Sequence, residues 1–272
     1  VRAQGKIVHF HWWSHLLFPA FFTALVAAKM SGKKIVCTVH NIETHEKSWL
    51  DAVFSRVFFK GVDHFIVHTE GLKKIFSRAY VVSPQRVHVI PHGVFDFYDN
   101  SSTPKQSRKR LNIPAEAKVL LYFGNMRPYK GMEDLIEAFS RLGREENYYL
   151  ILAGSPWNQE YAREIEERVK GLSSVLLKIA YIPEGEVGDY FQAADVVVLP
   201  YRNFTSQSGV GNIALAFEKP LIVSNAGGLS ELVLDEKLVF AAKDVTGLIA
   251  CIRYVFSSPT QLKKLGKDSE LL

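Results

Sequence analysis

The sequence predicts an α/β protein of two domains, each built on a parallel sheet with helices packed against it. Short apolar runs alternate with longer segments of helical periodicity, which is typical of parallel sheets covered by helices. A polar stretch over residues 96–110 interrupts this alternation, and a length of 272 residues suffices for two domains. Hydrophobic residues at 47% and charged residues at 22% exclude a disordered or fibrous protein.

The first domain is expected over residues 1–95, with strands and helices in strict alternation. The expected strands are 7–12, 34–39, 64–68 and 87–90, and the expected helices are 16–30, 49–59 and 72–80. The apolar segment 16–30 contains Pro19 and is shorter than the roughly 20 residues that a membrane span requires. We therefore expect a buried helix between two strands there, and no secretion signal is visible.

Residues 96–112 are expected to form a linker, because polar residues and prolines replace apolar ones. The charge run Lys105–Arg110 is predicted to be a solvated connector rather than a binding site. The second domain is expected over residues 113–272, with strands at 119–123, 149–153, 175–180, 196–199, 221–224 and 237–240 and helices at 133–142, 160–172, 187–193, 212–218, 229–234, 245–257 and 261–272. Open parallel sheets bind ligands at the carboxyl ends of their strands, so the cleft between the domains is the expected site.

Cysteine content and charge restrict the compartment and the partners. Cys37 and Cys251 lie far apart, which excludes a disulfide framework and a four-cysteine zinc site and fits a reducing, cytoplasmic compartment. The net charge of +5 favours anionic partners, either phosphate groups or acidic lipid headgroups, although a few solvated lysines would give the same value. No nucleic-acid partner is expected.

The strongest candidate site is the segment Gly124–Gly131, G-N-M-R-P-Y-K-G, between an apolar strand and a helix. Gly124 permits close approach of a ligand to the backbone. Arg127 offers a fork of donors and Lys130 a point charge, so the pair could neutralise a diphosphate leaving group. The alternative is a solvent-exposed basic turn in which Gly131 only shapes the backbone.

The second candidate site is the segment Pro200–Asn212, P-Y-R-N-F-T-S-Q-S-G-V-G-N. Small polar residues and two glycines at the start of a helix can bind an anion through free backbone amides. The alternative is ordinary helix capping by Ser208 or Asn212. A third turn, Asn225–Glu231, carries two glycines, and its Glu231 could bind a sugar hydroxyl or lie on the surface near a helix N-terminus.

Histidines and aromatic residues gather after the first two strands of the first domain. The residues are His9, His11, Trp12, Trp13, His15, His40, Asn41, Glu43, His45 and Glu46. Their spacing matches no closed metal-binding signature, so no metal site is expected. Such residues at the mouth of a cleft suit a carbohydrate ring, or they are partly buried aromatics with satisfied polar tips.

Five segments occur in a fixed order: V-I-P-H-G-V at 89–94, F-G-N-M-R-P-Y-K-G at 123–131, L-A-G at 152–154, A-D-V-V-V-L-P at 194–200 and K-P-L-I-V-S-N-A-G-G-L-S-E at 219–231. This set resembles the motifs of the retaining glycosyltransferase family 4, also called glycosyl transferases group 1. That family has the GT-B fold, in which two Rossmann-like domains face each other across a cleft. Over residues 7–80 the resemblance is looser and depends on strand–helix order and on T-V-H-N at 38–41.

The resemblance implies retaining transfer of a sugar from a UDP- or GDP-sugar to a glycan or lipid-linked acceptor, with no metal ion or other cofactor. It implies that Arg127 and Lys130 contact the donor diphosphate and that His40 lies near the transferred sugar. The implied donor-binding residues are Gly124, Asn125, Gly154, Tyr181, Ile182, Ser206, Gln207, Ser208, Gly209, Val210, Asn212 and Glu231. The residues expected on the acceptor side are His11, Trp12, Trp13, Asn41 and His45.

Two features depart from the family pattern. Thr205 and Ile213 occupy the positions of two glutamates that usually flank the phosphate loop, and S-Q-S-G-V resembles a branch with this substitution. We therefore expect that the donor ribose and sugar are held differently and that activity is weak or lost. The family also usually has further strands before the one at 7–12, so we expect a truncated first domain whose exposed edge leads to self-association, binding of a partner chain or instability.

The leading hypothesis is a glycosyltransferase of polysaccharide or glycolipid biosynthesis. A basic face could add peripheral membrane contact, although solvation explains its residues equally well: Lys29, Lys33, Lys34, Lys60, Lys73, Lys74 and Arg78. The second hypothesis is a non-catalytic nucleotide-sugar-binding protein or subunit of the same fold. A sugar-nucleotide epimerase would need acid/base carboxylates that the sequence does not locate. A nicotinamide dehydrogenase would need G-x-G-x-x-G where H-W-W-S follows the first strand.

Overall fold

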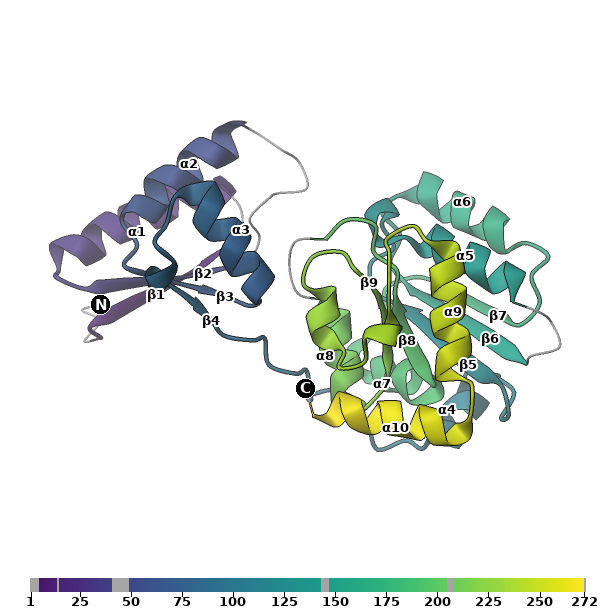
Figure 1. Cartoon of the computed structure of the whole chain (residues 1–272). Coiled ribbons are helices and arrows are strands. Elements are labelled where there is room, and N and C mark those ends of the chain that lie inside the picture. Colours follow the sequence, from purple (N-terminus) through teal and green to yellow (C-terminus); the bar gives the residue numbers. More distant parts are fainter. Residues whose placement is uncertain (1–4, 14, 41–48, 143–146, 205–207, 272) are drawn as a thin grey trace. The chain divides into compact units, whose positions relative to one another are not determined.

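The computed structural model describes residues 5–13, 15–40, 49–142, 147–204 and 208–271. They form two compact units, one over Val1–His92 and the other over Gly93–Phe204 together with Ser208–Leu272. Each unit is built on one sheet in which all described strand pairs are parallel (Figure 1). The predicted α/β class with two parallel-sheet domains is confirmed.

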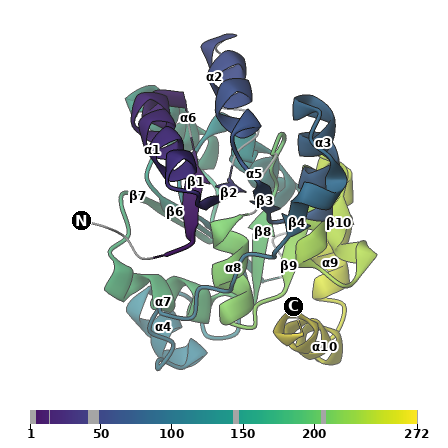
Figure 2. The same ribbon diagram turned by 90° about the vertical axis from the view of Figure 1, so that its left-hand side faces the viewer.

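The first unit has a four-stranded sheet in the order β1-β2-β3-β4. Its strands are β1 (Ile7–Trp12), β2 (Lys34–Val39), β3 (His64–Val67) and β4 (Val87–Val89), and its helices are α1 (Phe18–Met30), α2 (Trp49–Lys60) and α3 (Glu70–Tyr80), with 3₁₀ turns η1 (His15–Leu17) and η2 (Pro84–Arg86). All three helices lie on the same face of the sheet (Figures 1 and 2). This follows from the sequential strand order, because right-handed crossovers in one direction place every helix on one side.

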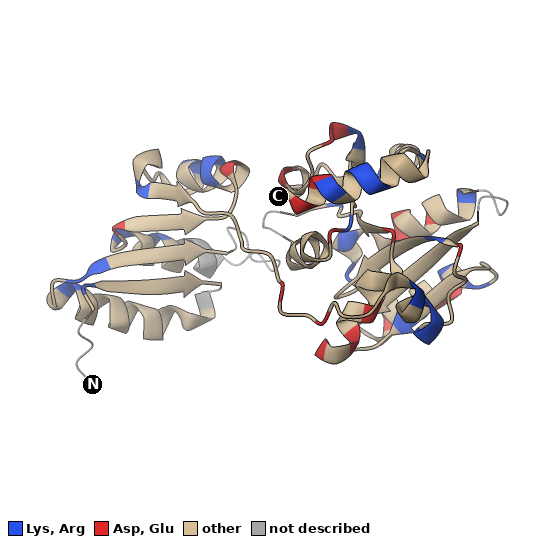
Figure 3. Cartoon of the chain, turned by 90° about the horizontal axis from the view of Figure 1, so that it is seen from below, with Lys and Arg blue, Asp and Glu red and all other residues tan. Residues whose placement is uncertain are grey.

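Alternation along β1 decides which side chains are buried in the first unit. Phe10 and Trp12 point toward the helices and join a core with Phe58 of α2, whereas His9 and His11 point to the opposite face. The four strands carry a single Lys, Arg, Asp or Glu, which is Lys34 (Figure 3). Imidazoles thus supply most of the polar groups on the helix-free face.

The second unit has a six-stranded sheet in the order β10-β9-β8-β5-β6-β7. Its strands are β5 (Lys118–Phe123), β6 (Tyr148–Gly154), β7 (Val175–Ile179), β8 (Val196–Leu199), β9 (Leu221–Ser224) and β10 (Val239–Phe240). Its helices are α4 (Pro104–Arg110), α5 (Met132–Arg141), α6 (Gln159–Val169), α7 (Glu184–Ala193), α8 (Gly209–Ala216), α9 (Val245–Val255) and α10 (Pro259–Glu270). Three 3₁₀ turns, η3 (Pro128–Lys130), η5 (Leu229–Leu232) and η6 (Glu236–Leu238), complete it, and η5 stands where a longer helix was expected.

Both faces of this sheet are covered, so its inner strands are largely apolar rather than alternating, whereas the edge strand β7 carries the exposed Lys178. One core packs Leu121 and Val197 against α7 and α8, and a second core packs Leu120 and Val198 against α5, α6 and α9. Because β5 and β8 are neighbours at the centre of the sheet, the turns that follow them emerge side by side. Those two turns carry the strongest sequence candidates for a binding site.

The predicted solvated connector at Lys105–Arg110 is wrong. Residues Pro104–Arg110 form helix α4, and a capping box between Thr103 and Gln106 fixes its start. Arg108 is buried and donates to both carboxylate oxygens of Asp195 at 2.8 Å. The helix is therefore an integral part of the second unit, because its central guanidinium has a carboxylate partner at the start of β8.

Candidate functional site

The turns after β5 and β6 are locked together by two glycines. The Gly124 amide donates to the Ala153 carbonyl at 2.9 Å, and both Gly124 (φ +99°) and Gly154 (φ +151°) adopt backbone angles that L side chains rarely adopt. A Cβ on Gly154 would lie 1.9 Å from the Gly124 carbonyl oxygen. Only glycine at position 154 allows these two backbones to touch.

Backbone pairing continues beyond the strand ends and places Arg127 against an aromatic ring. The Met126 amide donates to the Ser155 carbonyl at 2.7 Å, and the Trp157 amide donates to the Met126 carbonyl at 2.8 Å. As a result the Arg127 guanidinium carbon lies 4.3 Å from the centroid of the Trp157 ring. Stacking on one face leaves the N–H edge of a guanidinium free to bind oxygen atoms.

Lys130 ends the 3₁₀ turn η3 and lies beside the turn that follows β8. Its Nζ is 3.9 Å from the position of a Cβ on Gly124 and 5.0 Å from the centroid of the Tyr201 ring. Within the described ranges, neither Lys130 nor Arg127 forms an ion pair with a carboxylate. Two positive charges therefore lie at the carboxyl end of β5 without a negative partner there.

The N-terminus of α8 meets the same place. Ser208 caps the helix by accepting from the Gly211 amide at 3.3 Å, and its Oγ lies 3.2 Å from the buried Tyr201 hydroxyl. Val210 Cγ2 lies 3.0 Å from the position of a Cβ on Gly124. The structure thus brings Gly124, Lys130 and the first turn of α8 together, and a helix N-terminus adds partial positive charge.

The other predicted donor-side residues differ in burial, and some of them are exposed. Asn212 is buried in α8, and its Nδ2 has no hydrogen-bond partner among the described residues. Ile182 packs into the core of the second unit, whereas Tyr181 beside it is exposed. Asn125 is exposed at the end of β5 and Glu231 is exposed in η5. Ser206, Gln207, Asn41 and His45, which were also predicted, lie outside the described residues.

Sequence reasoning missed Trp157, and it gave no individual role to Tyr201 or Arg202 within the candidate segment Pro200–Asn212. The first two contact the cations Arg127 and Lys130 through their rings. The signal for Tyr201 was its place directly after a buried strand, two residues beyond Leu199. Trp157 carried no such signal, because its contact depends on the backbone pairing between two turns.

On the acceptor side, the structure joins Trp13, His11 and His40 but not Trp12. Trp13 stacks on His40 with a centroid distance of 3.9 Å, and His11 Nδ1 lies 3.0 Å from His40 Nε2. Trp12 was expected beside the acceptor, yet it is buried and stacks on Phe58 at 4.8 Å. That expectation was wrong because neighbouring residues of a strand point to opposite faces.

Four imidazoles form a row across the carboxyl ends of β1–β4. The ring centroids of His11, His40, His68 and His92 follow one another at 5.3, 5.2 and 5.2 Å. Burial, reinforced by the neighbouring imidazoles, lowers the pKa of His40 to about 4, and burial also lowers the pKa of His68. His40 is therefore neutral at pH 7, with one ring nitrogen a hydrogen-bond donor and the other an acceptor. Across the part of the chain that the structure describes, no three His, Cys, Asp or Glu side chains are arranged to hold a metal ion.

Acidification is expected to destabilise the first unit. Below its ordinary pKa of 6.5 the unfolded chain binds protons that His40 in the folded unit does not bind. The contribution of His40 to the free energy of unfolding is therefore fully present above pH 6.5. It is lost as the pH falls toward 4, which lowers the free energy of unfolding by roughly 1 to 3 kcal/mol. Urea unfolding of a Trp157→Phe variant at pH 7 and 4.5 measures this, because the remaining tryptophans all lie in the first unit.

A His40→Asn change serves as the comparison for that experiment, since it should remove most of the difference between the two pH values. Equal stability of the first unit at both pH values would contradict the prediction.

The family described as Glycosyl transferases group 1 matches residues 104–271, and the family described as Glycosyltransferase Family 4 matches residues 4–95. A D-inositol 3-phosphate glycosyltransferase of Kineococcus radiotolerans is 27% identical over 76% of this chain and 52% of its own length. A glycogen synthase of Mycobacterium tuberculosis is 26% identical over 97% of this chain and 63% of its own length. The chain thus spans about half to two thirds of the length of these curated relatives.

Solved structures share the fold. Sucrose-phosphate synthase from Thermosynechococcus elongatus superposes with a TM-score of 0.78 at 22% identity, over 98% of this chain and 68% of its own. Anabaena HepE in complex with UDP gives 0.80 at 17% identity, over 93% and 71%. These neighbours have the GT-B fold. Among the described helices of this chain, none is both long and apolar enough to cross a bilayer. With more than half of its residues matched by one family, the chain belongs to the glycosyl transferases group 1.

Proposed function

We propose that this protein transfers a sugar from a UDP- or GDP-sugar to a glycan or lipid-linked acceptor with retention of anomeric configuration. The observation that carries the proposal is the meeting of Gly124, Lys130 and the first turn of α8 at the carboxyl ends of β5 and β8. Neighbours support the donor class, since HepE was crystallised with UDP and UDP-glucose and a starch synthase of Arabidopsis thaliana with ADP. The acceptor class and the retention of configuration are taken from the family resemblance.

In the proposed mechanism the second unit stabilises the leaving group. As the bond between the anomeric carbon and the diphosphate oxygen breaks, negative charge grows on the phosphate. Lys130 and Arg127 neutralise that charge, and the N-terminus of α8 adds its dipole. The two cations supply the charge that a metal ion would otherwise supply, so we propose that transfer continues in the presence of EDTA.

In the first unit, His40 is proposed to hydrogen-bond the transferred sugar. Its low pKa keeps the ring neutral, and the stacked Trp13 holds the ring plane. A neutral imidazole can hydrogen-bond a sugar hydroxyl without adding a further positive charge. The exposed part of Trp13 and the neighbouring His11 are proposed to face the acceptor.

Replacing Lys130 with Ala is expected to weaken UDP or GDP binding by about 10- to 100-fold, because a charge-assisted contact to the diphosphate is lost. Arg127→Ala should have an effect of similar size. Calorimetric titration of the purified chain with UDP and with GDP measures both and identifies the base. Lys237→Ala is the matched control, since Lys237 lies 5.1 Å from the Tyr254 ring much as Lys130 lies beside Tyr201. Unchanged affinity in both site variants would refute the assignment.

The alternative is a non-catalytic nucleotide-sugar-binding subunit. It is favoured by Ile213, which occupies the position of a family glutamate and is buried in the core of the second unit. Release of free nucleotide from UDP- and GDP-sugars, measured with and without glycan acceptors, separates the two functions. Binding without release would support the alternative.

A further inference from the structure

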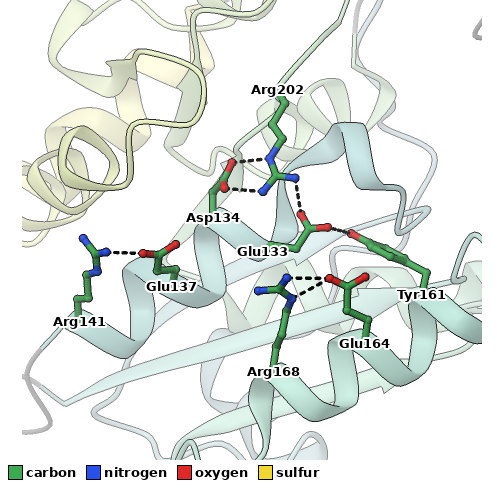
Figure 4. Close-up of polar contacts among 8 residues, drawn as sticks. All are labelled: Glu133, Asp134, Glu137, Arg141, Tyr161, Glu164, Arg168 and Arg202. Carbon is green, nitrogen blue, oxygen red and sulfur yellow. Dashed lines mark hydrogen bonds and ion pairs between the residues drawn. The ribbon is translucent and has the colours of Figure 1, made fainter.

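A buried polar cluster joins the start of α5 to the turn that follows β8 (Figure 4). Arg202 donates from Nε to Asp134 Oδ2 at 2.8 Å and from Nη2 to Asp134 Oδ1 at 2.6 Å. Its Nη1 lies 3.3 Å from Glu133 Oε2, and the Tyr161 hydroxyl donates to Glu133 Oε1 at 2.8 Å. We call Arg202, Asp134, Glu133 and Tyr161 the Arg202 clamp.

The Arg202 clamp differs from the other ion pairs in the same view. Asp134 and Arg202 side chains are 11% and 28% exposed, whereas those of Glu164 and Arg168 are 46% and 47% exposed. Arg168 pairs with a carboxylate one helical turn away on α6, which contributes little and fixes nothing beyond that helix. Arg202 instead makes a two-pronged contact between segments far apart in sequence, which fixes orientation as well as distance.

The turn that follows β8 contacts the residue on each side of Lys130. The Arg202 amide donates to the Tyr129 carbonyl at 2.7 Å, on one side of Lys130. On the other side, a Cβ on Gly131 would lie 2.0 Å from the Pro200 carbonyl oxygen. The backbone of Lys130 is thus seated against residues 200–202, and the side-chain contacts of Arg202 keep α5 in that place.

The guanidinium of Arg202 is occupied by the two carboxylates, so it acts through other residues. We propose that Arg202 is a positioning residue, which sets Lys130 beside the first turn of α8 and thereby provides affinity for the second phosphate of a nucleoside diphosphate. The inference rests on the proposed function, because it assumes that the diphosphate binds at Lys130. In this proposal, binding of the nucleoside and of the first phosphate does not depend on the Arg202 clamp.

The test is the Kd for UMP divided by the Kd for UDP, or the Kd for GMP divided by the Kd for GDP, measured by calorimetry on the full chain. Arg202→Gln is expected to lower this ratio at least tenfold while the monophosphate affinity stays unchanged. Arg202→Lys should give a partial loss, because an ammonium keeps the charge without the fork. Asp134→Asn keeps the shape of the Arg202 clamp and one acceptor, so this variant should fold and lower the ratio several-fold.

Two comparisons show whether Arg202 acts through Lys130. In a Lys130→Ala background, Arg202→Gln should cause no further fall in the ratio, because the residue that it positions is gone. Arg168→Gln, which breaks the exposed pair on α6, should leave both affinities unchanged.

The outcomes separate this inference from the proposed function. If Lys130→Ala lowers the ratio but Arg202→Gln and Asp134→Asn do not, the positioning role is refuted and the proposed function stands. An equal loss of monophosphate and diphosphate affinity in Arg202→Gln also refutes it, since that result indicates a general structural role. If the unaltered chain binds no nucleotide, both proposals are overturned.

Discussion

Replacing Arg108 with Ala is expected to destabilise the second unit by about 3–5 kcal/mol, which is a large part of the stability of an ordinary domain. The side chain of Arg108 is 10% exposed and donates to Asp195 and to the Ala193 carbonyl. Asp195 in turn accepts from the Val119 amide at 2.8 Å. The substitution leaves the Asp195 carboxylate without its cation and loosens α4 from the starts of β5 and β8.

Urea unfolding followed by circular dichroism measures this effect. Arg110→Ala is the control on the same helix, because Arg110 also pairs with an aspartate but its side chain is 55% exposed. The control should lose less than about 1 kcal/mol. Similar losses in the two variants would contradict the assignment of Arg108 as a buried structural residue.

Replacing Gly131 with Ala is expected to cost about 3 kcal/mol or more and to abolish most diphosphate binding. Gly131 has φ +65°, and its new Cβ would meet the Pro200 carbonyl oxygen at 2.0 Å. Since that atom belongs to backbone, η3 must move away from the turn after β8. Lys130 moves with it and leaves its position beside Gly124.

Gly171→Ala separates backbone strain from the clash. Gly171 has φ +80° in the same unit, yet a Cβ there meets nothing within 4 Å. That variant should lose only about 1–2 kcal/mol and keep its nucleotide affinity. Thermal unfolding and calorimetry on both variants decide the matter, and a Gly131→Ala protein with normal UDP or GDP affinity would disprove the prediction.

The inner strands of the second sheet were predictable because they are buried on both faces, so each is a largely apolar run. Both Val196–Leu199 and Leu221–Ser224 have the predicted bounds. Helix α4 was missed because its residues are polar, although the capping box formed by Thr103 and Gln106 was present in the sequence as a signal for a helix start.

Contacts between distant segments were less predictable than the elements. The motif at Gly124–Gly131 indicated which cations to examine, but the partners Trp157 and Tyr201 depend on which turns are neighbours in space. The Arg202 clamp needs β5 and β8 to be adjacent, which follows from strand order and not from local pattern. Trp12 shows the same limit, since only its strand register decides which face it occupies.

The touching backbones of Gly124 and Gly154 have a consequence for the thermodynamics of ligand capture. Ordering a mobile loop costs about 1–2 kcal/mol for each residue that becomes fixed. Here the turns after β5 and β6 are already paired by hydrogen bonds, so they are ordered when the chain folds and before any ligand binds. A ligand at these turns therefore binds to a preorganised site, and none of its binding free energy is used to order the two turns.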